Sequence, residues 1–509
     1  MSKQKVQNYL HELIKNLTQT EKRYFKLLAK QQTPGKKNDY ILLFEAIDKQ
    51  DEFDEEKIKA KFKGTSIEKR YPSLKKYLYE LIIKSLTFYN SDTISSVKVR
   101  RMMDGSEILQ RKGLYHQAIR KLKKAEVMAD EVGMYFIIND IRRLMISCQS
   151  MMGELPSEND FEVFKQKQNE NIKALAETNE IFNKSLDTVF YSMYSFDNTS
   201  FDKNKYKDLI SEDFKSIEEK IKNNYNKHLF YSTLKRYYSV LDEKNKAKEY
   251  NEKHIKLFEQ RLLNKKYLPS NYVHALMGKI ETLSLEEDFE EIKKIINDCK
   301  KFLNDSTTSY YNRNNDYAHL LCLEQNIALQ KGNIEEINKI GNVVCEYVEN
   351  SRNKINVFAN KWLIYNLAWT ETLNHNFKKA LGYSNDLLNN YQFSSSTYLY
   401  TPSILQNIAI HIELKNYGYL EFAIKSFHKE LRKHCNFNES ENIIFEFFLK
   451  HLEDLDGNRI KQMILFEKLE NNYQKSINEN KDFSSLLLLN WIKSKSGTHE
   501  IEELLAKAI

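Results

Sequence analysis

Few residues in this sequence of 509 residues have both the type and the spacing that metal binding or catalysis needs. His428, His434 and Cys435 lie close together and offer two imidazoles and a thiol, but their spacing matches no common zinc-binding pattern. None of the twelve histidines forms a His-Glu-x-x-His motif, and no EF-hand calcium loop occurs. We therefore expect no metal and no cofactor.

The spacing of the thirteen glycines excludes several enzyme motifs. No two glycines lie two, four or five residues apart, so G-x-G-x-x-G, G-x-x-x-x-G-K-[ST] and G-x-S-x-G are all absent. These motifs bind dinucleotides, hold phosphates or present a nucleophilic serine. We expect a protein that is not an enzyme, with a catalyst of an unrecognised type as an alternative.

Acidic and aromatic clusters in the sequence have structural explanations. Glu286-Glu287-Asp288 and Glu335-Glu336 lie at predicted helix starts, where the helix dipole favours negative charge. Three aromatic pairs are expected to fill grooves between helices rather than to stack on bases, namely Tyr237-Tyr238, Tyr310-Tyr311 and Phe447-Phe448.

The composition predicts an all-α protein. Glycine and proline together supply only 18 residues, and these are the residues that end helices and make tight β-turns. Hydrophobic residues make up 41% of the chain, which is enough apolar surface to oppose disorder. Long helices and few strands are the expected result.

The cysteines and the longest apolar stretch bear on location. The five cysteines are widely spread with no C-x-x-C pair, which is typical of reduced thiols. Residues 1–13 lack the apolar core of a signal peptide, and the apolar stretch at 486–492 is far shorter than a membrane span. We expect a soluble cytoplasmic protein with no membrane partner.

The charge distribution indicates two domains. Residues 1–100 carry 21 Lys and Arg against 13 Asp and Glu, whereas the net charge of the whole chain is +7. Residues 1–95 are predicted to form a small basic domain of short helices, with a capping box at Thr18-x-x-Glu21 and a long last helix that starts near Pro72. The apolar pattern lapses near 91–96, so residues 96–509 form the predicted second domain.

From about residue 97 a pattern of paired helices repeats. One helix ends at Gly113, and the next has Ala118, Leu122 and Ala125 on one face. Small residues on that face let two helices approach closely, while the bulky ones fill the gap between hairpins.

A second unit has the same arrangement. Trp362, Tyr365 and Ala368 precede a turn at 374–376, and four residues of the next helix follow on one face, namely Phe377, Ala380, Ser384 and Leu387. Both units resemble the tetratricopeptide repeat family, in which a Gly or Asn turn is followed by a small residue, a large apolar residue and another Ala. The resemblance implies stacked helical hairpins.

Turn residues recur at a nearly constant spacing of 40 to 44 residues, at Asn245, Asp288, Gly332, Asn376, Asn416 and Gly457. Counting backward from Asn245 in steps of 44 residues predicts turns near residues 201 and 157 and then reaches Gly113. One further step forward from Gly457 ends near Gly497. The period exceeds the 34 residues of a tetratricopeptide unit. We predict a right-handed α-solenoid with long repeats, with a HEAT-like array or irregular helices as alternatives.

A solenoid of this kind offers a concave surface lined by the first helix of each hairpin. Such surfaces bind extended peptides or a helix of another protein. We therefore predict a non-enzymatic scaffold or regulator whose partner is a protein or peptide. The predicted lining residues are Asn271, His274, Arg313, Tyr317, Lys361, Tyr365, Asn366 and Gln406.

Nucleic-acid binding through the first domain is the alternative function. Residues 57–62, a turn at Gly64 and the helix that follows loosely resemble a helix-turn-helix or winged helix. Bacterial peptide-responsive regulators have a similar layout, with a helical N-terminal domain before a tetratricopeptide array. The predicted basic patch consists of Lys61, Lys63, Lys69, Arg70, Lys75 and Lys76. The first four of these are expected to contact phosphates.

Overall fold

The computed structural model describes nine segments of the chain and a few residues near its C-terminal end. These are residues 9–32, 38–90, 94–153, 157–195, 203–286, 288–305, 312–351, 355–390 and 399–434, with 448, 487, 488, 490–492 and 494. All regular structure in these residues is helical, with no strand among them, so the all-α prediction is confirmed. The chain divides into two compact units, Met1–Ser157 and Glu158–Ile509.

The first unit begins with six helices around one hydrophobic core. They are α2 (Tyr9–Asn16), α3 (Gln19–Gln32), α4 (Asp39–Asp48), α5 (Glu55–Lys61), α6 (Ser66–Lys69) and α7 (Tyr71–Tyr89). Phe25 and Phe44 are fully buried in this core, with ring centroids 4.7 Å apart. The predicted capping box is confirmed at the start of α3, because the Thr18 amide donates to Glu21 Oε2 (2.7 Å) and the Glu21 amide donates to Thr18 Oγ1 (3.2 Å).

Three further helices complete the first unit, namely α8 (Ser95–Arg111), α9 (Tyr115–Glu131) and α10 (Tyr135–Met151). Helix α9 packs against both α8 and α10. Its residues Ala118, Leu122 and Ala125 are fully buried, as the sequence predicted. Both connections end at a glycine in the left-handed region, Gly113 (φ 73°) and Gly133 (φ 71°), where a side chain would be strained.

The second unit begins with α11 (Glu158–Ser195), a single helix of 38 residues. The period instead predicts two helices between turns near 157 and 201. Residues 158–195 contain no glycine or proline, so nothing interrupts the helix. Short helices follow at α12 (Lys203–Lys207) and α13 (Glu212–Ser216), with a 3-10 turn at Ile217–Lys220.

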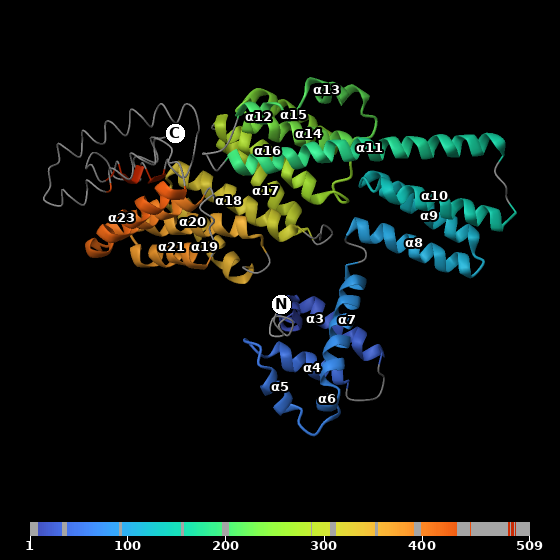
Figure 1. Ribbon diagram of the computed structural model, residues 1–509, viewed down its shortest axis with the longest axis horizontal. Coiled ribbons are helices and arrows are strands. Elements are labelled where there is room, and N and C mark those ends of the chain that lie inside the picture. The colour runs from blue at the N-terminus through green and yellow to red at the C-terminus, as the bar shows by residue number, and fades with distance from the viewer. Residues whose placement is uncertain are drawn as a thin grey trace. The chain divides into compact units, whose positions relative to one another are not determined.

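Five helical hairpins follow in chain order (Figure 1). They are α14 (Asn224–Val240) with α15 (Lys244–Glu259), α16 (Pro269–Glu286) with α17 (Phe289–Asn304), α18 (Arg313–Lys331) with α19 (Ile334–Ser351), α20 (Val357–Leu373) with α21 (Phe377–Asn390), and α22 (Tyr400–Glu413) with α23 (Tyr417–His434). Their first helices begin at 224, 269, 313, 357 and 400, which are 43 to 45 residues apart. The predicted spacing near 44 therefore holds over these hairpins.

Most predicted turn residues lie at the hairpin turns. Asp288 is the N-cap of α17, and Gly332 ends α18 in the left-handed region. Asn376 and Asn416 immediately precede second helices. Asn245 lies instead inside the first turn of α15, after a turn in which Asp242 has φ 61°. Gly457 and Gly497 lie outside the described residues.

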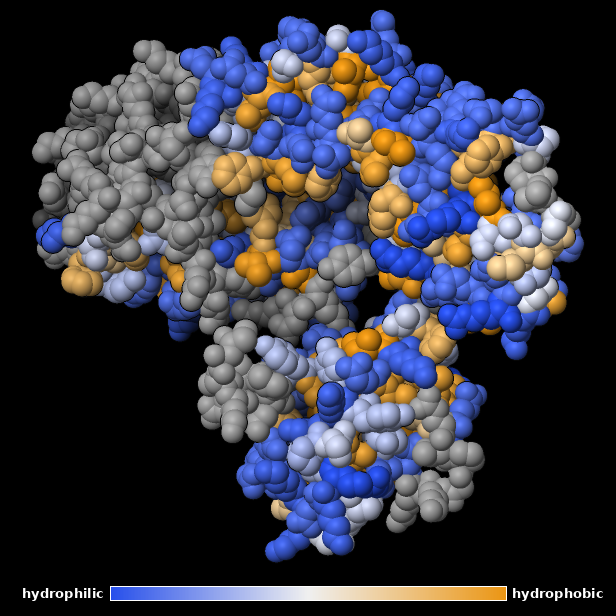
Figure 2. Space-filling model, turned by 45° about the vertical axis from the view of Figure 1, so that its right-hand side comes forward, coloured by the Kyte–Doolittle hydropathy of each residue, from blue (hydrophilic) through white to orange (hydrophobic). Residues whose placement is uncertain are grey.

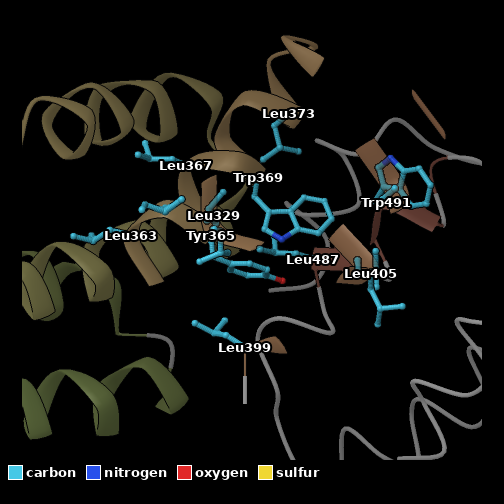
Figure 3. Close-up of a cluster of buried hydrophobic side chains, with 14 of the residues drawn as sticks. Leu329, Leu363, Tyr365, Leu367, Trp369, Leu373, Leu399, Leu405, Leu487 and Trp491 are labelled. Carbon is cyan, nitrogen blue, oxygen red and sulfur yellow. The ribbon is translucent and has the colours of Figure 1, made fainter. Parts of the chain in front are cut away.

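The first helices of the last hairpins share the largest hydrophobic cluster. In α20, 14 of 17 residues are buried, including Tyr365, Ala368 and Trp369. Figure 3 shows the Trp369 indole in the middle of this cluster, close to Tyr365. The second predicted repeat unit is confirmed here, since Ala380 and Leu387 of α21 are also fully buried. A helix buried on all sides must pack against neighbours on both flanks, and α20 contacts both α18 and α22.

A close approach between α19 and α20 requires a glycine. A methyl group added at Gly341 would lie 2.9 Å from Thr370 Cγ2, closer than carbon atoms pack. Gly382 in α21 is also helical, but a methyl group there would meet nothing within 4 Å. Alanine substitutions at Gly341 and Gly382 can therefore be compared to separate the effect of packing from the effect of helix propensity.

We predict opposite effects for alanine at these two glycines. Gly382→Ala should raise the free energy of unfolding by about 0.5–1 kcal/mol, because glycine is a poor helix former. Gly341→Ala should lower it by about 1–3 kcal/mol through overpacking. Adding Thr370→Ser removes the opposing methyl and should recover part of that loss. Urea unfolding followed by circular dichroism measures all three, and equal gains at the two glycines would contradict this packing.

Candidate functional site

Four of the eight predicted groove residues lie in the interior. Tyr365, Asn366 and Gln406 are at most 1% exposed, and Lys361 is 8% exposed. The Gln406 amide donates to the Tyr365 carbonyl (3.0 Å), and the Asn366 amide donates to Asn326 Oδ1 (2.7 Å). The sequence-based prediction put these residues on an open groove, because it took polar residues of a helix to lie on a solvent-facing side. Helices α20 and α22 are buried nearly all round, so their polar residues lie inside.

The other four groove residues lie on the neighbouring first helices α16 and α18, which contact each other. His274 is about half exposed, and Asn271 is partly buried. Arg313 donates from Nε to the Leu303 carbonyl (2.5 Å), near the end of α17. Tyr317 is half-buried, and its ring packs against a tyrosine of α19. The predicted groove residues that a partner can reach therefore lie on α16 and α18.

Two buried histidines that the sequence analysis missed extend this site toward α14 and α15. His228 Nδ1 lies 2.6 Å from His254 Nε2, and Asn271 donates from Nδ2 to His228 Nε2 at 2.8 Å. Since His228 Nε2 accepts, its single proton must sit on Nδ1 and point at His254 Nε2. The three side chains thus form one hydrogen-bonded chain across three helices.

A second polar group continues along α16 and α18. His274 Nε2 lies 2.9 Å from Oδ1 of Asp316, a carboxylate residue that is only 1% exposed. His319 stacks near His274 with ring centroids 6.4 Å apart, and His319 Nε2 contacts Asn356 Nδ2 at 3.3 Å. His274 is therefore held against a buried carboxyl group on the neighbouring first helix.

Burial keeps the inner histidines neutral. It lowers the pKa of His228 to about 4, and a positive charge on His274 acts in the same direction. The pKa of His254 is well below the ordinary value, first because of burial and then because of the adjacent His228. The pKa of His319 is also lowered, mainly by burial.

The residues of this site recur at a regular spacing in the sequence. His228, His274 and His319 are spaced by 46 and 45 residues, close to the hairpin period. Asparagines recur in the same way near the start of four successive first helices, at Asn226, Asn271, Asn315 and Asn360. Comparison of the turns alone could not find them, because these residues lie within helices.

The buried amides differ in how well they are bonded. Asn226 donates to the Ala174 carbonyl (3.1 Å) and to Glu177 (2.5 Å), and it accepts from Thr178 (2.7 Å) on α11. Gln325 on α18 is only 2% exposed, and neither of its amide atoms has a hydrogen-bond partner among the residues that the structure describes. The Asn226 amide joins two helices, whereas the Gln325 amide leaves unsatisfied polar groups in the core.

The predicted basic patch is only partly available for a partner. Arg70 pairs with Asp39 (2.7 Å), and Lys75 lies 3.3 Å from Glu55 and over the Tyr71 ring. The remaining four side chains of the patch are exposed, with no ion pair to any described residue, namely Lys61, Lys63, Lys69 and Lys76. The structure places all six on or beside the short helices α5 and α6 and the first turns of α7.

The described residues hold no group of three side chains arranged to bind a metal ion. Of the histidine and cysteine cluster in the sequence, Cys435 and the side chains of His428 and His434 lie outside the described residues. Within the described part, no helix combines the length and the apolar character needed to cross a bilayer. Figure 2 shows a visible face on which hydrophilic residues interrupt the hydrophobic ones.

Comparison of the chain with protein-family models, with curated proteins and with solved structures found no match.

We predict that the two buried amides respond oppositely to apolar replacement. Gln325→Met should raise the free energy of unfolding by about 1–3 kcal/mol, because it removes two unsatisfied polar atoms while keeping the shape. Asn226→Leu should lower it by about 1–3 kcal/mol, because Glu177 and Thr178 lose a buried partner. Thermal unfolding at constant pH measures both. Destabilisation by Gln325→Met would show that its amide is bonded after all.

Proposed function

We propose that this chain is a non-enzymatic protein- or peptide-binding scaffold or regulator. In this proposal the hairpins stack into a right-handed solenoid similar to tetratricopeptide arrays, and the first helices face the partner. The observation that carries the proposal is the recurrence of polar residues at matching places on successive first helices, at Asn226, Asn271, Asn315 and Asn360. Asn271 and Asn315 of this series are only partly buried, so it reaches the surface on α16 and α18.

The half-exposed residues of α16 and α18 are the parts of this row that a partner can reach. His274 offers an imidazole beside a buried carboxylate, and Tyr317 offers an aromatic face with a hydroxyl group. Hydrogen-bonding groups and one aromatic ring suit a peptide with polar and apolar side chains, which such surfaces bind in other helical repeats.

The thiols support a reducing compartment such as the cytoplasm. The four described cysteines, Cys148, Cys299, Cys322 and Cys345, are free. Burial raises the pKa of Cys299 to about 12 and also raises the pKa of Cys322, so these two thiols are unreactive. Buried free thiols of this kind are typical of proteins that do not meet an oxidising environment.

Site-specific photo-crosslinking of the full chain tests the proposed groove. Asn314 on the first helix α18 and Asn342 on the second helix α19 are both exposed residues of one hairpin, so they form a matched pair. A photoreactive residue at 314 should capture a discrete protein or peptide, and the same residue at 342 should not. Tyr317→Ala should reduce capture from 314 at least several-fold. Equal capture from both positions, or none from 314, would contradict the proposal.

Nucleic-acid binding by the first unit is the second candidate. The observation that favours it is the group of exposed lysines without an ion pair to any described residue, three of which are Lys63, Lys69 and Lys76. Exposed amines of this kind release counterions when they meet phosphates, so binding would weaken steeply with salt.

Substitution of the three lysines Lys63, Lys69 and Lys76 by alanine in the full chain tests this candidate. If each contacts a phosphate of duplex DNA, the slope of log affinity against log salt should fall by about 1 for each lysine removed. Fluorescence anisotropy of a labelled duplex measures the slope. A matched triple substitution of exposed lysines in the second unit, at Lys222, Lys256 and Lys266, should leave it unchanged. Absence of binding at low salt would end this candidate.

A further inference from the structure

The contact between His228 and His254 admits only one arrangement of protons. Both side chains are buried, at 2% and 4% exposure, so water does not compete for their nitrogens. The Asn271 amide donates to His228 Nε2, and His228 Nδ1 donates to His254 Nε2 across 2.6 Å. Each ring therefore carries one proton and is neutral. The chain links α14, α15 and α16, which belong to two successive hairpins.

A proton added to either imidazole ring breaks one of these hydrogen bonds. A cationic His228 would carry a proton on Nε2, which would then face the N–H of Asn271. A cationic His254 would carry a proton on Nε2, which would face the Nδ1–H of His228. Either cation replaces a hydrogen bond by two opposed donors and also places a charge in the interior.

We propose that the His228–His254 contact is a proton-sensitive junction that holds the α14–α15 hairpin against α16 at neutral pH and loosens on acidification. This inference does not depend on the proposed partner groove. It does bear on it, because Asn271 belongs both to the junction and to the candidate site.

Charged groups on the surrounding helices do not offset a cation in this pair. On α16, His274 raises the local positive potential, although it is paired with Asp316 of α18 at 2.9 Å. On α14, Lys235 acts in the same direction on His254, and it is paired with Glu281 of α16 at 2.5 Å. The carboxylate of Glu177, on α11, is bonded to asparagines of the α14 N-terminus.

The remaining neighbours are neutral. Tyr225 lies edge-on to His228 with centroids 5.7 Å apart, and burial raises the pKa of its hydroxyl. Phe258 of α15 contacts both imidazole rings. The pair is therefore enclosed by aromatic rings and by ion pairs that are already complete.

The direction of the pH effect follows from proton binding. In the unfolded or opened state each histidine titrates near 6.5, whereas burial lowers the pKa of His228 in the folded state to about 4. The opened state thus binds more protons between these values, so the junction is fully stable above pH 6.5 and weakens as the pH falls toward 4. At pH 5 the opening equilibrium should exceed that at pH 7.5 by about 30-fold for each histidine.

Hydrogen exchange of the full chain measures this opening. Peptides covering 244–286 should show the increase between pH 7.5 and pH 5.0, after correction for the intrinsic exchange rate, whereas peptides of α20 should show a much smaller change. His254→Gln keeps an acceptor for His228 but cannot be protonated, so it should remove one of the two 30-fold factors. His116→Gln, at an exposed histidine of α9, is the matched control and should change nothing.

A titration of the wild-type chain decides the question if His254→Gln does not fold. In spectra of the chain labelled with ¹⁵N-histidine, His228 and His254 should remain neutral at pH 5.5. Titration of either buried histidine near pH 6.5, or exchange over 244–286 that is independent of pH, would overturn the proposal.

Discussion

A helical hairpin cannot cover its own apolar surface, and the second unit depends on the way successive hairpins cover one another. Helix α20 makes this constraint plain, since it is buried on nearly all sides and contacts α18 and α22 as well as its own partner α21. First helices must therefore lie beside first helices, which keeps the hairpin length between 43 and 45 residues. It also explains the glycine at 341, where α19 approaches α20 too closely for a side chain.

Polar residues are retained in this interior, and several of them join neighbouring helices. Asn366 bonds to Asn326 of the preceding first helix, and Gln406 bonds to the backbone of α20. Hydrogen bonds between such groups are strong where water is excluded, and they fix the register of one hairpin on the next. The same low dielectric makes the unsatisfied Gln325 costly and makes His228 sensitive to protons.

Features encoded locally could be predicted from the sequence. The capping box at Thr18 and Glu21 and the buried face of α9 depend on residues within one or two turns of each other. The hairpin spacing could be predicted because turn residues mark it in the sequence. The fusion of two expected helices into α11 was missed, because a regular period was extended over a segment that lacks helix-ending residues.

The candidate site was harder to predict, for a different physical reason. A single helix shows which residues are polar, but not whether both its faces are covered by neighbours. Residues such as Asn366 and Gln406 were therefore assigned to a surface that the structure places inside. The histidine pair was missed because His228 and His254 meet only when two helices of a hairpin pack together.

In the second unit, first helices pack beside one another in chain order. Carbodiimide coupling tests this most directly, because it joins only an amine and a carboxylate that are already in contact. Lys235 of α14 and Glu281 of α16 lie 2.5 Å apart. Mass spectrometry of the coupled full chain should identify an amide bond between these two residues. Coupling of Lys235 to carboxylates of distant hairpins instead would contradict the arrangement.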